Sequence, residues 1–215
     1  NTIAHNHLGL ALAKQGRINE AVRHYSEALR TDPDYANSHS NMGDILMKQG
    51  NLEAAVTHFE RALEIKPDDA TIHSNLGVAL IRQNKTAEAA AHFRKSVQSD
   101  PDYAPAYYNL ANILKREGNT TEAIAHFQKA ISVKPDYADA HYNLANTLMQ
   151  QGKTSEALTH FQKALQFKPD DAEIHNQIAV IFMKQGKIKE AAAYFRKAVQ
   201  IEPLNANMHN NLGIA

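Results

Sequence analysis

The 215-residue sequence contains no cysteine, and its acidic and basic residues cancel at 23 each. Without cysteine, neither a disulfide framework nor thiolate chemistry is available. Zero net charge, with no stretch that concentrates Lys and Arg, argues against nucleic acid or an anionic membrane surface as the partner. No apolar run approaches the roughly 20 residues that a membrane-spanning helix needs. We expect a soluble fragment, compatible with the cytoplasm or the periplasm and with a membrane-anchored parent protein.

Glycine is also scarce, and two recurring positions account for all nine glycines. Four glycines follow an apolar residue in a recurring Leu-Gly or Met-Gly pair, and five stand at recurring turn positions, so none remains for a phosphate-binding loop. Ser and Thr are scattered, and no carboxylate pair is tied to an enclosed pocket. The sequence therefore predicts a non-enzymatic chain without a cofactor.

Proline is infrequent too, but its spacing is regular. Six of the seven prolines stand 34 residues apart without insertion or deletion: Pro33, Pro67, Pro101, Pro135, Pro169 and Pro203. A 34-residue unit cannot bury its apolar face alone and must stack on its neighbours. The prediction is an all-α solenoid of stacked antiparallel helix pairs. It forms one array over residues 1–215, with repeats at 2–35, 36–69, 70–103, 104–137, 138–171 and 172–205 and a partial repeat at 206–215. Because the chain starts at Asn1 and stops inside an opening helix, we expect it to be a piece of a longer protein.

Residues 104–135 show the pattern of one repeat. The first helix has apolar residues at i, i+3, i+4 and i+7, namely Tyr107, Leu110, Ala111 and Leu114. Gly118 supplies a residue able to take a positive φ at the turn, where Asn84 is the one exception among the copies. The second helix has a small-large-small pattern at Ala123, Phe127 and Ala130. Pro135 ends it, and Asp136 is expected to cap the next helix.

These patterns resemble the tetratricopeptide repeat, which runs W-x2-L-G-x2-Y, then A-x3-F, then P. Six full copies and part of a seventh fit, and the resemblance implies a right-handed superhelix whose first helices line a concave surface. The A-x3-F element recurs at Ala21/Tyr25, Ala55/Phe59, Ala89/Phe93, Ala123/Phe127, Ala157/Phe161 and Ala191/Phe195. The chain departs from the pattern at the opening aromatic, which is histidine in six copies and Tyr107 in the other.

One amide-bearing position, opposite the apolar stripe of the first helix, recurs along the chain. An asparagine amide offers both a donor and an acceptor, so such a row suits the backbone of an extended peptide. The repeats look most like those of the O-linked N-acetylglucosamine transferase superhelix, where such a ladder binds unstructured segments, and like those of large membrane proteins with tetratricopeptide arrays. The predicted peptide-binding residues are Asn41, Asp44, Asn75, Tyr108, Asn109, Asn112, Tyr142, Asn143, Asn146, Gln177 and Asn211. His7 occupies the same position in the first repeat, and the fourth and fifth repeats are expected to make the strongest contacts.

Other interpretations of the same pattern remain open. The asparagines are also explained as the solvated face of copied repeats. A carboxylate clamp is poorly supported, because the basic residues Lys48, Arg82 and Arg116 come only in the last helical turn. The chain also fits the substrate-recruiting arm of an enzyme, such as a glycosyltransferase, with its catalytic domain outside these residues. Exposed apolar ends also fit head-to-tail self-association.

Twelve histidines raise the question of metal binding. Eleven fall on two repeated positions, one on each helix of the unit: His5, His39, His73, His141, His175 and His209, and then His24, His58, His92, His126 and His160. Translation along a solenoid separates such residues, whereas a metal needs ligands that converge on one point. We therefore expect packing histidines and no metal site. If they are neutral and partly buried, charging them below a pKa near 6.5 would make the fold sensitive to acid.

Overall fold

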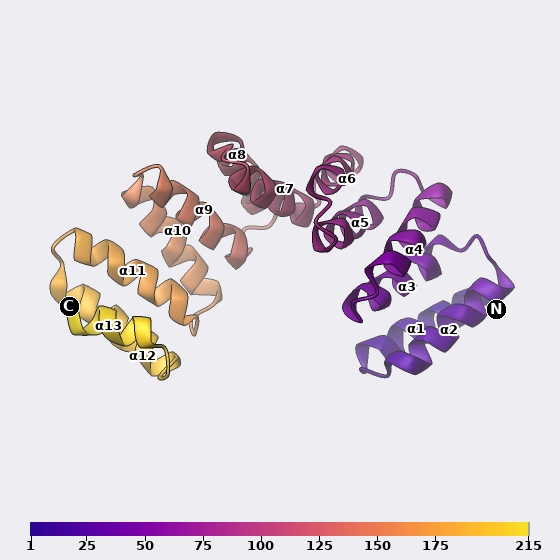
Figure 1. Cartoon of the computed structure of the whole chain (residues 1–215), viewed down its shortest axis with the longest axis horizontal. Helices are drawn as coiled ribbons and strands as arrows, with labels where there is room; N and C mark the ends of the chain where they lie inside the picture. Colours follow the sequence, from indigo (N-terminus) through magenta and orange to yellow (C-terminus); the bar gives the residue numbers. More distant parts are fainter. Residues whose placement is uncertain (215) are drawn as a thin grey trace. The chain divides into compact units, whose positions relative to one another are not determined.

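The structure is a computed structural model that describes residues 1–214 (Figure 1). Over this part of the chain every regular element is an α-helix, so the all-α prediction is confirmed. The chain divides into two compact units, one at Asn1–Leu110 and a second that begins at Ala111. The helices of the first unit are α1 (Thr2–Lys14), α2 (Ile18–Thr31), α3 (Ala36–Lys48), α4 (Leu52–Ile65), α5 (Ala70–Arg82), α6 (Thr86–Ser99) and the start of α7 (Ala104–Arg116).

The second unit contains the end of α7 and six further helices. These are α8 (Thr120–Val133), α9 (Ala138–Gln150), α10 (Thr154–Phe167), α11 (Ala172–Lys184), α12 (Ile188–Ile201) and α13 (Ala206–Ile214). In both units a helix packs against its successor within a repeat, as α3 does on α4 and α9 on α10. The second helix also packs against the first helix of the next repeat, as α4 does on α5. Figure 1 shows these helices following one another as pairs within each unit.

The core of each repeat is built around the aromatic residue of its second helix. These rings are almost completely buried: Tyr25, Phe59, Phe93, Phe127, Phe161 and Phe195. In the first three repeats a glycine of the first helix lies directly over the ring. A Cβ atom added to Gly43 would lie 2.8 Å from Phe59 Cε1. The fourth, fifth and sixth repeats instead have alanine at this position, and Ala111, Ala145 and Ala179 are buried.

The turns between the two helices of a repeat depend on residues that accept a positive φ. Gly118 has φ of 84° and Gly152 has φ of 75°, and Asn84 takes the same conformation with φ of 64°. Asparagine is among the few residues other than glycine that visit this region at low cost. The prediction that Asn84 replaces glycine at a positive-φ turn is therefore confirmed.

The predicted cap at Asp136 is wrong. The residue that precedes α9 is Tyr137, and it makes no side-chain capping bond. The second and fifth repeats end in two consecutive aspartates, so that Asp69 and Asp171 stand directly before α5 and α11. They accept hydrogen bonds from Ile72 N and Ile174 N, both at 3.1 Å. Capping needs the residue adjacent to the helix, and Asp136 lies one position too early. Among the described residues, no helix has the length and apolarity required to span a bilayer.

Candidate functional site

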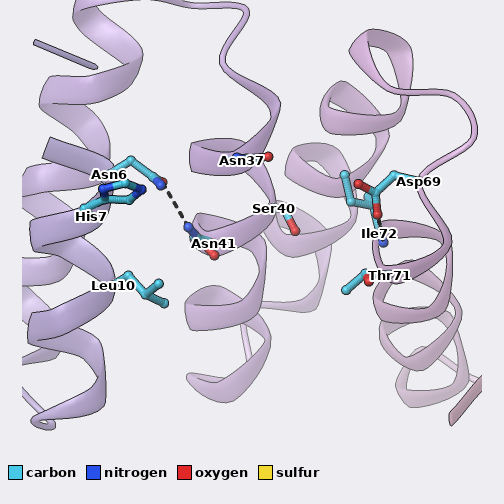
Figure 2. A pocket seen from close by; sticks show the side chains of 9 residues that line it. All are labelled: Asn6, His7, Leu10, Asn37, Ser40, Asn41, Asp69, Thr71 and Ile72. Atoms are coloured by element: carbon cyan, nitrogen blue, oxygen red, sulfur yellow. Dashed lines mark hydrogen bonds between the residues drawn. The ribbon is translucent and has the colours of Figure 1, made fainter. Parts of the chain in front are cut away.

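The first helices of the first unit line a cavity of about 310 Å³ (Figure 2). Residues from α1, α3 and α5 contribute to it, and Figure 2 shows the asparagines of α1 and α3 facing each other across the gap between these helices. Apart from Leu10 and Ile72, the side chains are polar. The full lining is Asn6, His7, Leu10, Asn37, Ser40, Asn41, Asp69, Thr71 and Ile72.

Two amides join α1 to α3 at this cavity. Asn6 is buried, with 4% of its surface exposed. Its Oδ1 accepts hydrogen bonds from Ser38 Oγ at 3.1 Å and from Asn41 Nδ2 at 2.9 Å. Figure 2 shows the Asn41 nitrogen directed toward Asn6 and its oxygen directed away. The predicted residue Asn41 therefore uses its donor on the neighbouring helix and leaves its acceptor available.

The same arrangement recurs between α3 and α5. Asn75 Nδ2 donates to Asp44 Oδ1 at 2.9 Å, and a carboxylate can only accept, so this amide orientation follows from the chemistry. In the second unit Asn211 Nδ2 donates to Asn176 Oδ1 at 2.9 Å. Gln177 differs, because its amide donates to Glu173 of its own helix at 2.6 Å. The predicted row of amides thus includes bonds between successive first helices, which sequence reasoning missed.

Asp44 lies half-buried in this surface, and its surroundings disfavour charge. Burial raises the pKa of its carboxyl group to about 6, against a smaller opposing effect of Lys48. Burial also raises the pKa of Tyr25 to about 12, and the Asp44 charge adds to that effect. A carboxylate held in this way is a strong acceptor that has little solvent around it.

The other predicted residues are half-buried on the first helices. Tyr108 and Asn109 lie in the part of α7 that belongs to the first unit, and Asn112 lies in the part that belongs to the second. Tyr142, Asn143 and Asn146 lie on α9. The structure gives Tyr142 a separate cavity of about 170 Å³, lined also by Ala138, Asp139, Lys168, Asp171, Glu173 and Ile174. Burial raises the pKa of Tyr142, while its hydrogen bond with Asn146 acts in the opposite direction.

Sequence reasoning did not select Asn6, Ser38 or Asn176. Asn6 and Asn176 occupy the position just before the repeated amide, and asparagine also stands there at Asn210. The corresponding residues in the other repeats are serine or tyrosine, so this second polar row was visible only as a weaker pattern.

Family models match the chain without a gap from residue 9 to residue 205. Models described as TPR repeat match residues 9–50 and 43–84, and models described as tetratricopeptide repeat match residues 70–103, 92–125, 114–181 and 172–205. The chain belongs to the tetratricopeptide repeat family. This confirms the family that the sequence resembles. No curated protein matches it.

Solved structures of tetratricopeptide proteins share this fold. MamA is 26% identical, with 77% of this chain and 97% of that chain covered and a TM-score of 0.68. PilF of Pseudomonas aeruginosa is 18% identical over 100% of this chain and 97% of its own, with a TM-score of 0.90. YrrB, described as a TPR protein with an unusual peptide-binding site, is 20% identical, with 86% and 96% covered and a TM-score of 0.69. At these identities PilF and YrrB support the tetratricopeptide fold alone.

Proposed function

We propose that this tetratricopeptide chain is a non-catalytic scaffold that binds extended segments of other proteins along the amide-bearing face of its first helices. The observation that carries the proposal is the polar cavity across α1, α3 and α5, with the Asn6–Asn41 bond at its wall. A surface shared by the first helices of three successive repeats suits a ligand that runs across them. An extended peptide has this form, because it presents backbone groups every 3.3 Å or so along its length.

The orientation of the amides indicates which peptide groups they contact. Asn41 and Asn75 both use Nδ2 on the neighbouring helix, so Oδ1 is the atom that each offers to a ligand. An oxygen acceptor binds a peptide N–H group whatever the side chain of that residue is. We therefore expect broad recognition of unstructured segments, with little dependence on their side chains.

The proposal extends to the predicted residues that the first cavity does not contain. In the first unit these are Asp44, Asn75, Tyr108 and Asn109, and in the second unit Asn112, Tyr142, Asn143, Asn146, Gln177 and Asn211. Half-buried tyrosines beside amides are typical of surfaces that bind peptides. YrrB, which has the same fold, is described as having a peptide-binding site, and this likeness supports a similar use of the surface here.

A steric variant tests the site without breaking its hydrogen bonds. Thr71 is exposed on α5 and lines the cavity, so Thr71→Trp would fill the space while Asn41 and Asn75 keep their partners. Thr57→Trp, on the exposed face of α4, is the matched control. Binding to an array of unstructured peptides would be measured by fluorescence anisotropy, with folding checked by circular dichroism. We expect Thr71→Trp to weaken binding about tenfold or more and Thr57→Trp to leave it unchanged.

Two outcomes would contradict the proposal. If the unmodified protein binds none of the peptides, the first-helix face is a solvated surface. If both tryptophan variants bind peptides as tightly as the unmodified protein, the binding surface lies elsewhere.

A further inference from the structure

Histidines from the two helices of a repeat meet in pairs, which the sequence did not predict. In four repeats Nδ1 of the first-helix histidine lies 3.0 Å from Nδ1 of the second-helix histidine. The two members are always 19 residues apart. The pairs are His5–His24, His39–His58, His73–His92 and His141–His160. We call them the histidine pairs.

A backbone carbonyl determines where the protons of a pair lie. Nε2 of His73 is 2.8 Å from the carbonyl oxygen of Pro67, and a carbonyl accepts hydrogen bonds but cannot donate them. Nε2 of His73 therefore carries the proton, and its Nδ1 is the acceptor when the ring is neutral. His92 must then donate from its own Nδ1. His39 and His141 contact Pro33 and Pro135 in the same way, both at 3.0 Å, so three pairs share this assignment.

This arrangement accepts one extra proton but not two. The first added proton goes to Nε2 of the second-helix histidine, which still donates from Nδ1 to its neutral partner. A second proton would have to enter at Nδ1 of the first-helix histidine. Two N–H groups and two positive charges would then face each other across 3.0 Å, and the hydrogen bond would be lost.

At two of the pairs burial is the largest influence on the pKa of both histidines and lowers it, while nearby charges and the proline carbonyls act in both directions. Burial lowers the pKa of both His73 and His92. Lys95 on α6 lowers both further, whereas Asp68 and Asp69 before α5 and Glu88 on α6 oppose this. Burial likewise lowers the pKa of His141 and His160, with Lys163 adding to the effect at His141 and Glu156 opposing it at His160. Burial also lowers the pKa of His58, and His39 contributes to that shift.

Metal binding is a weaker explanation of the same geometry. No cluster of three or more His, Asp or Glu side chains suitable for a metal occurs within residues 1–214. A pair alone supplies two ligands, fewer than the three or four that proteins use for zinc. The ammonium groups of Lys95 and Lys163 near two of the pairs also disfavour a cation.

We propose that the histidine pairs form an acid-sensitive latch between the two helices of a repeat, which holds with up to one added proton per pair and opens with the second. Two of the six full repeats lack it. Tyr107 replaces the first histidine in the repeat at 104–137, and Tyr194 replaces the second in the repeat at 172–205. In the latter, Nδ1 of His175 is buried without a hydrogen-bond partner. The latch therefore belongs to particular repeats, and the chain itself supplies natural replacements for its members.

The test copies Tyr194 into the four pairs by changing His24, His58, His92 and His160 to Tyr. Melting temperatures would be compared at pH 7.5 and 5.0, with Gln128→Tyr as the control, at an exposed residue of α8 in a repeat without a histidine pair. Because burial lowers the folded-state pKa of His58, His73, His92, His141 and His160, the unfolded chain binds more protons at these residues below about pH 6.5. Stability is therefore lost as pH falls through that value. Between pH 7.5 and 5.0 we expect the melting temperature of the quadruple variant to fall by less than about half as much as that of the unmodified protein, and Gln128→Tyr to behave like the unmodified protein.

A gain-of-function variant and a titration keep the proposal testable if the quadruple variant does not fold. Tyr194→His would give His175 a donor, so the pH dependence of melting should become steeper. In the unmodified protein, nitrogen NMR should show His73 and His141 still neutral at a pH where their partners His92 and His160 are charged. Equal pH dependence of melting in all variants, or pairs whose two members become charged together, would overturn the latch.

Discussion

The side chain of Asp44 is half-buried, and burial disfavours the charged form of its carboxyl group. Its pKa of about 6 exceeds that of an aspartate in an unfolded chain, so the ionised group reduces folding stability at neutral pH. Asn75 donates to its Oδ1, and an amide oxygen would accept the same bond. The fourth and fifth repeats have asparagine at this position, at Asn112 and Asn146.

We therefore predict that Asp44→Asn stabilises the protein at pH 7.5 by about 1–2 kcal/mol, after allowance for solvent screening at a half-buried site. The sign follows from linkage: the folded carboxyl takes up its proton at about pH 6, before the unfolded one does. The gain should shrink as pH falls from 6 and vanish near 4. Urea unfolding at several pH values measures it, and Asp136→Asn, at an exposed side chain, is the control. A gain that persists at pH 4 would show that the carboxylate charge is not its cause.

At the scale of the helix pair, the distance between the helices is matched to one small residue of the first helix. Gly43 lies against the buried ring of Phe59. Three repeats further along the chain, the buried Ala145 occupies the equivalent position in the repeat of Phe161. Alanine normally stabilises a helix relative to glycine by about 0.5–1 kcal/mol. In α3 the added methyl group would meet the ring at 2.8 Å, which is closer than contact allows.

We predict that Gly43→Ala destabilises the protein by about 1–2 kcal/mol, because overpacking of the buried ring outweighs the gain in helix propensity. The reciprocal change, Ala145→Gly, should also destabilise it by about 1 kcal/mol through the lost methyl group and the greater backbone freedom. Chemical denaturation of both variants measures these effects. If Gly43→Ala were stabilising, as at an exposed helix position, the close approach of α3 to Phe59 would be refuted.

The sequence was sufficient to predict which helices form, but not how their polar side chains pair. The 34-residue spacing of proline, the buried aromatic of each second helix and the positive φ of Asn84 all follow from local rules that repeat. The 3.0 Å contact of His73 with His92 depends on the relative rotation of two helices, which no single-helix pattern contains. The bond from Asn75 to Asp44 depends in the same way on how one repeat sits on the next.

At the scale of the whole molecule, charge is balanced and dispersed. The chain carries 23 basic and 23 acidic residues. The ion pairs found in residues 1–214 lie at the surface. In Arg17–Glu20 the two side chains are 52% and 47% exposed, and in Lys168–Asp139 they are 45% and 52% exposed. Pairs this exposed contribute about 0–1 kcal/mol each, and mobile ions screen them.

Folding should therefore depend weakly on salt. Between 50 and 500 mM NaCl at pH 7.5, we expect the melting temperature to change by less than about 3 °C, because there is neither strong self-repulsion to relieve nor a large network of pairs to lose. Calorimetry at constant buffer composition measures this, and the same series at pH 5.0 provides a comparison in which charged histidines repel. A fall of more than about 5 °C at pH 7.5 would mean that exposed pairs such as Lys168–Asp139 act together as a stabilising network, contrary to their exposure.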